Sequence, residues 1–472
     1  AKQLAQFALL LKACQKDSSF ADAHIMPRVL DMPEPYPFKD NLCDTLPHFF
    51  LGGNQEMIQE VCDAIGLMDQ AKNLGSIMKF NISERTRNAI MIRMEEYEKE
   101  THVSEAIRQL MPYMNIILAL TEKYSALVMN PPYMGSANMN LELSNYVKHY
   151  YDEGKADLMT VFMMVADNMT YDKGKYAMIN LPSWLFIATF ERIRQHIIND
   201  QHIDSLLHMG RGIFGIDWGS VAFTISKQPC NWEGKYFRLH KRNFQHIYYY
   251  HIQQLFLNSL NDHSYRFNFD EYRDDSGVSK TLDFQSDQNG QLIYYSFDQS
   301  NFNKIPGKVI GYWVSSQIIN IFSDANIGDK AKVIAGLCTG DNGHYIFNWH
   351  EVGINHVLLP EKEFVDKRFK FHNKGGNQRK WYGNHDYIVK YNAKDLISLR
   401  NLVGFRNDGN EFFYKESISW AKISSSYSTF RFYPKGFVFD SAGSSIFEEN
   451  GYTPTLLAFC NSAISRFIIN LI

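Results

Sequence analysis

Hydrophobic residues recur along the chain with two different spacings. In residues 1–16, Leu4, Phe7, Ala8 and Leu11 fall on one helical face, which predicts an amphipathic helix. Residues 17–70 contain five prolines and are predicted to be a connector with short helical pieces. A short strand is predicted over 75–80. Helical spacing returns over 87–120, where a run of glutamates indicates a solvated face.

Strands and helices alternate from residue 124 onward. Apolar runs at 124–129, 175–181, 203–209 and 221–226 are typical of buried strands. Helices are predicted between them, one with Asp157 as its N-cap residue and another over 190–198. This order predicts a mostly parallel sheet with helices on its faces, which is an α/β fold.

The composition changes after Pro229. Residues 229–310 are aromatic and polar with several acidic positions, and we expect a linker or connecting region there. From 311 onward, short aromatic strands alternate with Gly/Asn turns, which predicts an α+β or β-rich domain over 311–472. The expected organisation is therefore a first domain over 1–228, a connector over 229–310 and a second domain over 311–472.

Both ends of the sequence carry apolar, periodic residues. The helical pattern begins within the first residues, the chain starts with Ala1, and residues 456–472 form an apolar segment without a cap. We expect the sequence to be an internal fragment of a longer protein, truncated within its second domain.

Composition excludes several classes of protein. With 45% hydrophobic and 14% aromatic residues in 472, the chain is rich enough in core-forming side chains to fold. The six cysteines lie far apart without paired spacing, which argues against a zinc site and a disulfide framework and favours a cytoplasmic protein. No apolar run approaches the ~20 residues of a membrane helix, so no membrane partner is expected.

A local excess of positive charge lies in the second half. The net charge of the whole chain is −3, yet residues 361–435 hold 15 lysines and arginines against 8 acidic residues. Aromatic residues are interleaved with these cations, which is the mixture that DNA-contacting modules use. The candidate contacts with double-stranded DNA are Lys374, Arg379, Lys380, Trp381, Tyr382 and Arg406, and Lys415, Arg431, Tyr387, Phe405 and Tyr427 lie in the same segment.

Asn130, Pro131, Pro132 and Tyr133 directly follow the apolar run at 124–129. The carboxyl end of a strand in an α/β sheet is where ligands bind, and two successive prolines make the loop rigid. The Asn130 side-chain oxygen and the Pro131 carbonyl could each accept one hydrogen of an adenine amino group. That arrangement directs the nitrogen lone pair at an electrophilic methyl group and stabilises the developing charge. Tyr133 is expected to stack on the flipped base.

Asn-Pro-Pro-Tyr resembles the catalytic motif of S-adenosylmethionine-dependent amino-methyltransferases that act on adenine. Residues 134–139 and 183–186 are similar to the PglX-type adenine methyltransferases of bacteriophage-exclusion (BREX) phage-defence systems, as are 336–342, 373–384 and 437–446. The resemblance implies a Rossmann-like class I methyltransferase core followed by a target-recognition domain over 311–472. It further implies S-adenosylmethionine beside Asn130 and Pro131, and other BREX proteins and phage anti-defence inhibitors as partners.

One part of that family's pattern has no counterpart in the sequence. Neither its Gly-rich cofactor loop nor the acidic residue that holds the ribose is matched, and we expect both upstream of Ala1. Residues 210–215 match G-x-G-x-x-G literally but are followed by the strand at 221–226, so a turn between two strands is the better interpretation.

Two alternative functions remain open from the sequence. A non-catalytic DNA-binding or phage-sensing component would fit the missing cofactor loop. A protein-glutamine N5 methyltransferase would use the same four residues on a side-chain amide, although such enzymes lack a long basic and aromatic second domain.

Overall fold

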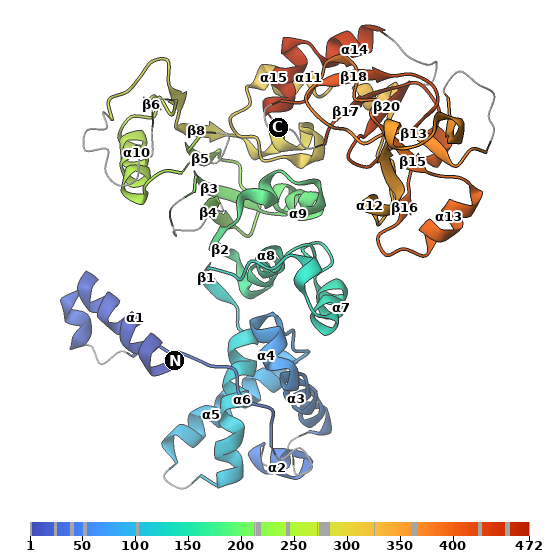
Figure 1. Cartoon of the computed structure of the whole chain (residues 1–472). Helices are drawn as coiled ribbons and strands as arrows, with labels where there is room; N and C mark the ends of the chain where they lie inside the picture. Colours follow the sequence, from blue (N-terminus) through green and yellow to red (C-terminus); the bar gives the residue numbers. More distant parts are fainter. Residues whose placement is uncertain are drawn as a thin grey trace. The chain divides into compact units, whose positions relative to one another are not determined.

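The polypeptide divides between Trp313 and Val314 into two units, which are described separately (Figure 1). A computed structural model describes residues 2–22, 26–37, 42–50, 54–100, 103–211, 213, 219–241, 246–270, 272, 284–324, 326–359, 366–422, 427–448 and 454–471. The statements below concern these residues.

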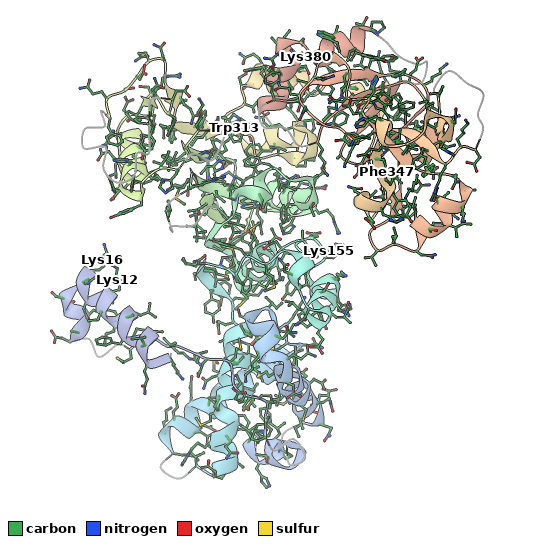
Figure 2. All side chains as sticks on the ribbon, in the orientation of Figure 1. Lys12, Lys16, Lys155, Trp313, Phe347 and Lys380 are labelled. Carbon is green, nitrogen blue, oxygen red and sulfur yellow. The ribbon has the colours of Figure 1, made fainter. Side chains whose placement is uncertain are left out.

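The first part of unit 1 is helical. Its elements are α1 (Lys2–Lys16), η1 (Ser18–Ala21), α2 (Leu42–Phe49), α3 (Gln55–Leu67), η3 (Met68–Gln70), α4 (Ala71–Leu74), η4 (Gly75–Ile77), α5 (Glu84–Lys99) and α6 (Glu105–Thr121). The predicted helix over 1–16 is confirmed, but none of its residues is buried. Figure 2 shows its side chains, with Lys12 and Lys16 labelled near the end of the helix.

Two predictions for this helical part were wrong. Residues 17–70 are more than a connector, because α3 begins at the N-cap residue Asn54 and buries Met57, Ile58, Val61 and Ile65. All five prolines of this segment precede Asn54, so none of them interrupts α3. Residues 75–80 form no strand: η4 occupies Gly75–Ile77, and Ile77 and Met78 are buried in the helical core instead of pairing with a sheet.

The rest of unit 1 is built on a sheet. Its elements are β1 (Tyr124–Met129), η5 (Ser136–Asn138), α7 (Leu141–Tyr150), α8 (Leu158–Met169), β2 (Thr170–Asn180), η6 (Pro182–Leu185), η7 (Ala188–Phe190), α9 (Glu191–Asp200), β3 (His202–Met209), β4 (Ser220–Ser226), β5 (Gly234–Leu239), α10 (Tyr249–Asn261), β6 (Arg266–Phe267), β7 (Gln291–Leu292), β8 (Tyr294–Phe297), η8 (Gln299–Lys304) and η9 (Pro306–Lys308).

The six-stranded sheet has the order β1-β2-β4-β3-β5-β8 and is mixed. β1 pairs with β2 and β3 with β5 in parallel, whereas β4 runs antiparallel to both of its neighbours and β8 antiparallel to β5. The prediction of a mostly parallel sheet was therefore wrong. Only ten residues separate the end of β3 from the start of β4, too few for the crossover that a parallel pair requires.

The strand β1 lies at the edge of the sheet and is largely exposed, which corrects the prediction of a buried strand. Val128 keeps 82% of its surface accessible. Ala177 and Ile179 of β2 and Ala222 of β4 are also only partly buried, and all three line a cavity on the sheet. An apolar run marks a strand but does not tell on how many faces it is covered.

Residues 229–310 are not a linker, which corrects the sequence prediction. β5 and β8 extend the same sheet beyond β3, and α10 packs against it. Phe237, Leu239, Ile252 and Leu255 are buried together in the core between this helix and the sheet. The aromatic and polar composition that suggested a connector belongs to a sheet edge with one helix covering it.

Arg194 of α9 joins distant parts of unit 1. Its fully buried guanidinium donates hydrogen bonds to the carbonyl oxygens of Trp184 and Ile187, each at 2.8 Å, and of Gly307 at 2.6 Å. Burial lowers the pKa of Arg194 to about 10, so the group still carries its charge at neutral pH. The side chain thus ties α9 and the segment after β2 to residues more than one hundred positions later.

Replacing Arg194 with Met is expected to destabilise unit 1 by about 3 kcal/mol, because it leaves buried carbonyl oxygens without donors. Thermal unfolding measures the loss. The matched control is Arg192→Met on the same helix, where the side chain is exposed and pairs with Asp152 at the surface, and where little change is expected. Equal losses in both variants would contradict this role of Arg194.

Unit 2 is rich in short strands, as predicted. Its elements are α11 (Ser316–Ile321), η10 (Ile327–Asp329), β9 (Ala331–Ile334), β10 (Leu337–Cys338), α12 (Asn342–Tyr345), β11 (Ile346–Asn348), η11 (Trp349–Glu351), η12 (Ile354–His356), β12 (Val357–Leu358), β13 (Phe369–Asn373), β14 (Trp381–Tyr382), β15 (Tyr387–Lys390), α13 (Ala393–Arg400), β16 (Arg406–Asn407), η13 (Asn410–Phe412), β17 (Ser417–Trp420), β18 (Phe430–Tyr433), β19 (Phe437–Phe439), β20 (Ser445–Glu448), α14 (Pro454–Cys460) and α15 (Ala463–Leu471).

Two five-stranded sheets form the centre of unit 2. One has the order β11-β15-β13-β12, with β19 also pairing with β13, and the other has the order β14-β18-β17-β20-β9. β14 consists of two candidate contact residues, Trp381 and Tyr382, and pairs with β18.

Candidate functional site

The carboxyl ends of β1 and β2 lie side by side. The two strands are parallel, with Val128 opposite Ala177 and Met129 opposite Met178. Asn130 therefore leaves β1 next to Ile179 of β2. The sequence predicted a ligand-binding position at this end of the strand, and the structure puts the Asn-Pro-Pro-Tyr loop there.

The four loop residues differ in exposure. Asn130 and Pro132 are exposed, Pro131 is buried and Tyr133 is half-buried. Asn130 also lines a cavity of about 420 Å³ on the sheet, together with Val128, Met129, Ala177, Met178, Ile179, Ser205, Leu207, Ala222, Phe223 and Thr224. The loop is thus anchored through Pro131 and open to a ligand through Asn130.

Tyr133 contacts Asn130 within the loop. Its hydroxyl oxygen lies 3.1 Å from Asn130 Oδ1 and 2.9 Å from the carbonyl oxygen of Ile179, so its one proton can be donated to either. Burial raises the pKa of Tyr133, which keeps the hydroxyl protonated. An amide oxygen has two lone pairs, so this contact orients Asn130 and leaves one lone pair for another donor. The sequence did not predict this second role for Tyr133.

Asp157 joins the loop to the helix that follows it. Its Oδ1 accepts a hydrogen bond from the backbone N–H of Met159 at 2.9 Å, which confirms it as the N-cap residue of α8. The same oxygen accepts the N–H of Met134 at 3.2 Å, and the Leu158 N–H donates to the Met134 carbonyl oxygen at 3.0 Å. Burial raises the pKa of Asp157, while the two backbone donors oppose that rise. The carboxyl group therefore fixes the chain immediately after Tyr133.

One residue near the loop was missed by the sequence analysis. Asn180 ends β2 beside the loop and is fully buried, and neither atom of its amide group has a hydrogen-bond partner among the described residues. Buried polar groups are normally paired. Only the neighbouring register of β1 and β2 reveals its proximity, because Asn180 lies fifty residues after Asn130 in the sequence.

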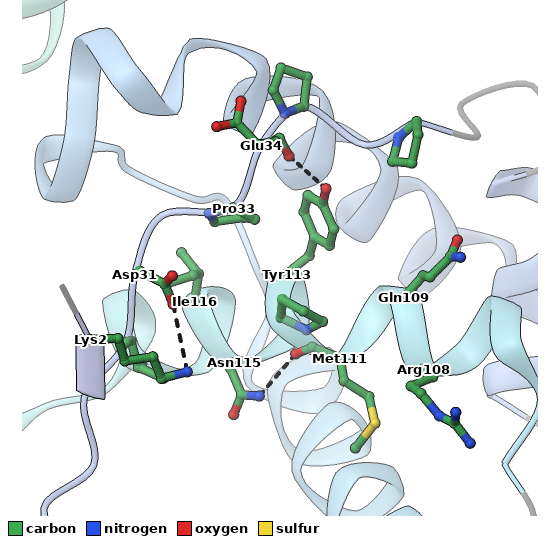
Figure 3. A pocket seen from close by; sticks show the side chains of 14 residues that line it. Lys2, Asp31, Pro33, Glu34, Arg108, Gln109, Met111, Tyr113, Asn115 and Ile116 are labelled. Carbon is green, nitrogen blue, oxygen red and sulfur yellow. Dashed lines mark hydrogen bonds and ion pairs between the residues drawn. The ribbon is translucent and has the colours of Figure 1, made fainter. Parts of the chain in front are cut away.

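A larger cavity lies elsewhere in unit 1. It measures about 750 Å³ and is lined by residues of 2–37 and 108–116 (Figure 3). Tyr113 donates a hydrogen bond to the Glu34 carbonyl oxygen at 2.6 Å beside it, and Lys2 pairs with Asp31. None of the predicted site residues lines this cavity, so it is not the candidate site.

Most of the predicted contact residues of unit 2 lie in one loop. Arg379, Trp381 and Tyr382 are exposed, and Lys374 and Lys380 are partly exposed. Lys374 Nζ lies 5.0 Å from the ring centre of Tyr387, and Lys380 Nζ lies 5.7 Å from that of Tyr427. Lys380 is labelled in Figure 2.

Arg406 and Arg431 also belong to the basic segment 361–435, but neither lies on the exposed surface of the loop that holds Arg379, Trp381 and Tyr382. Arg406 is exposed on β16, which pairs with β10 in a separate two-stranded sheet. Arg431, counted in the basic segment, is fully buried, which corrects its interpretation as a surface cation. Its guanidinium donates to the Gly375 carbonyl oxygen at 2.8 Å and so supports the loop from below.

Three further features concern metal binding, membranes and the glycine-containing turn after β3. Among the residues that the structure describes, no cluster of His, Cys, Asp or Glu could hold a metal ion. Within the same residues, no helix is both long and apolar enough to cross a membrane. Residues 210–215 follow β3 and precede the antiparallel β4, as expected for a turn, although 212 and 214–215 lie outside the described residues.

Comparison with known proteins identifies relatives of the chain. Residues 1–214 match the model of the family described as "Eco57I restriction-modification methylase". The whole chain is 29% identical over 499 aligned residues to the adenine-specific methyltransferase PglX of Lacticaseibacillus casei (strain Zhang), of which it covers 38%. The resemblance to PglX-type methyltransferases is confirmed.

A second relative matches the chain at the same sequence identity. The adenine-specific methyltransferase BrxX of Escherichia coli O9:H4 (strain HS) is 29% identical over 416 residues, which cover 86% of the chain and 32% of BrxX. The chain thus spans about one third of the length of the PglX and BrxX relatives. The type IIL restriction-modification enzyme MmeI, solved with DNA, aligns with 90% of the chain and 60% of its own at 11% identity and a TM-score of 0.43, which is too loose to bear on function.

Replacing Asp157 with Ala is expected to loosen the loop, because the variant loses both the cap of α8 and the acceptor for the Met134 N–H. Loss of such a cap costs about 1 kcal/mol. Hydrogen exchange of a peptide spanning 130–140 should accelerate in Asp157→Ala. Asp157→Asn, which keeps an acceptor oxygen, should restore most of the protection. Unchanged exchange in the Ala variant would mean that Asp157 does not hold the loop.

Proposed function

We propose that the chain is the catalytic and DNA-contacting part of an adenine-N6 DNA methyltransferase. Its relatives PglX and BrxX are named adenine-specific methyltransferases. The observation that carries the proposal is the exposed Asn130 at the carboxyl end of β1, with its amide oxygen oriented by the Tyr133 hydroxyl. A rigid loop that presents one hydrogen-bond acceptor beside a cavity fits the task of holding a planar amine.

The chemistry follows from the electronic structure of adenine. The lone pair of the amino nitrogen is delocalised into the ring, so the group is a poor nucleophile. In our proposal the free lone pair of Asn130 Oδ1 accepts one N6–H and the Pro131 carbonyl oxygen accepts the other. These contacts strengthen as positive charge develops on nitrogen, which is the condition for lowering the barrier. The flipped base stacks on the ring of Tyr133.

S-adenosylmethionine is the methyl donor that this proposal implies. It supplies an electrophilic methyl group when bound. The residues present fit the acceptor side of the transfer, since Asn130 lines the cavity at the strand end. Among the described residues of unit 1, no Gly-rich turn joins a strand directly to a helix, so no residue beyond Asn130 and Pro131 is assigned to the donor. Asn130 and Pro131 are the positions that we place next to the donor.

The second unit is proposed to contact double-stranded DNA. Support comes from the excess of cations in 361–435 and from the exposure of Arg379, Trp381, Tyr382 and Arg406. Lys374 and Lys380 are the other two residues that we propose to contact DNA. We further propose that the complete protein acts in BREX phage defence in the cytoplasm, with the other BREX proteins as partners and phage anti-defence proteins as inhibitors.

Replacing Asn130 with Ala in the full-length protein is expected to lower adenine methylation at least ~100-fold, because one preorganised acceptor is lost. Digestion of treated DNA and mass spectrometry of its nucleosides measures N6-methyladenine. Asn199→Ala, at an exposed asparagine of α9 in the same unit, is the matched control and should methylate normally. Since Asn130 is exposed, both variants should melt like the wild type.

Three results would contradict this assignment. Methylation that survives Asn130→Ala would remove the loop from the reaction. Wild-type protein that binds the donor and DNA without methylating it would favour the non-catalytic DNA-binding component. Methyl transfer to a glutamine side chain of a protein instead of to DNA would favour the protein-glutamine methyltransferase.

The two roles of Tyr133 can be separated by substitution. Tyr133→Phe keeps the stacking ring and loses only the hydroxyl, which lies within hydrogen-bonding distance of Asn130 Oδ1 and of the Ile179 carbonyl oxygen. Loss of the contact that orients Asn130 costs about 1 kcal/mol, so we expect roughly a fivefold loss of kcat. Tyr133→Ala loses both the hydroxyl and the ring, so its kcat should be well below that of the Phe variant. Equal activity of the two variants in a steady-state methylation assay would show that the ring does not hold the base.

A further inference from the structure

The loop between β13 and β14 has an unusual backbone. Gly375 and Gly376 have φ angles of 82° and 97°, and Trp381, a bulky residue, has φ 72°. A side chain with a Cβ in the left-handed region costs about 1–3 kcal/mol. Such a conformation persists only where the surroundings fix it, so the position of Trp381 is held by the rest of unit 2.

Buried side chains hold this loop from inside. The Gly375 carbonyl oxygen accepts hydrogen bonds from the guanidinium of Arg431 at 2.8 Å and from the amide of Asn384 at 3.1 Å. Asn384 also donates to the Asn377 carbonyl oxygen at 2.8 Å, and its own carbonyl oxygen accepts the Tyr433 hydroxyl at 2.9 Å. These contacts join both ends of the loop to β18, so it is ordered before any ligand arrives.

The loop presents aromatic surface to solvent. Trp381 and Tyr382 are 52% and 59% exposed, although they pair in β14 with the buried Arg431 and with Phe432 of β18. Arg379 and Lys380 precede them directly in the sequence. Two large rings on a fixed backbone lose little conformational entropy when a flat partner stacks on them.

The surrounding charge selects the kind of partner. Exposed Trp, Tyr and Arg also form hot spots for proteins. The segment 361–435, however, holds 15 basic against 8 acidic residues within a chain of net charge −3. Cations beside aromatic rings match a nucleic acid, whose phosphates need charge and whose bases stack on rings.

We propose that Trp381 and Tyr382 form a rigid stacking platform that receives a base of bound DNA that has left its neighbours in the duplex. The proposal rests on the proposed DNA methyltransferase function and adds to it a second contact with an unstacked base, in unit 2. Arg379 and Lys380 hold the flanking phosphates. The buried contacts of Arg431 and Asn384 keep the platform in place in the absence of DNA.

Binding of fluorescent oligonucleotides to the full-length protein tests the platform. One probe is a regular duplex and the other is the same duplex with a short mismatch bubble, whose bases are already unstacked. Trp381→Ala should weaken binding to the bubble about tenfold or more, in the range measured for lost stacking. The slope of affinity against salt should not change, because a stack releases no counterions.

Three variants complete the design. Trp349→Ala removes an equally exposed tryptophan of unit 2, 47% accessible, and should bind both probes like the wild type. Trp381→Phe keeps a stacking ring and should retain most of the affinity, which separates stacking from misfolding. Arg379→Ala should instead lower the salt slope.

The outcomes separate the platform from the enzyme. If the wild type methylates DNA and Trp381→Ala binds the bubble equally well, the platform is wrong and the function stands. A loss in Trp381→Ala that comes with the altered salt slope of Arg379→Ala would also overturn it. Wild-type protein that binds neither probe would overturn both proposals.

Discussion

The hydrogen bond between the Tyr133 hydroxyl and Asn130 Oδ1 is the contact on which this account of the molecule depends. It converts an exposed, rotatable amide into an acceptor with a defined direction. The parallel pairing of β1 with β2 places the Ile179 carbonyl oxygen, a second acceptor for the same hydroxyl proton, beside Tyr133, and Asp157 fixes the chain after it. Catalysis by orientation requires such rigidity, since small displacements of a reacting group cost much of the rate.

The two units offer different kinds of contact to a ligand. In our proposal the neutral loop after β1 accepts hydrogen bonds from an amine. The loop before β14 is proposed to contact DNA through rings and cations. Both loops are held by buried polar groups, Asp157 in the first and Arg431 with Asn384 in the second. Preorganisation is therefore the common property of the two sites.

The place of the candidate loop could be predicted from the sequence, whereas the sheet around it could not. Asn130 to Tyr133 are adjacent and directly follow an apolar run, so their position at the end of a strand was predicted correctly. The antiparallel β4 and the exposed face of β1 depend on pairings between segments far apart, which periodicity does not reveal. Asn180 and the second contact of Asp157 were missed for the same reason. Arg431 was misjudged because a count of charges does not distinguish a buried guanidinium from an exposed one.

The measurement that tests the central claim most directly is a structure of the full-length protein with duplex DNA and a non-reactive donor analogue. The account predicts an adenine turned out of the helix, with its amino nitrogen within hydrogen-bonding distance of Asn130 Oδ1 and of the Pro131 carbonyl oxygen. A bound duplex whose adenines all remain stacked, or a flipped base whose amino group faces away from Asn130, would contradict it.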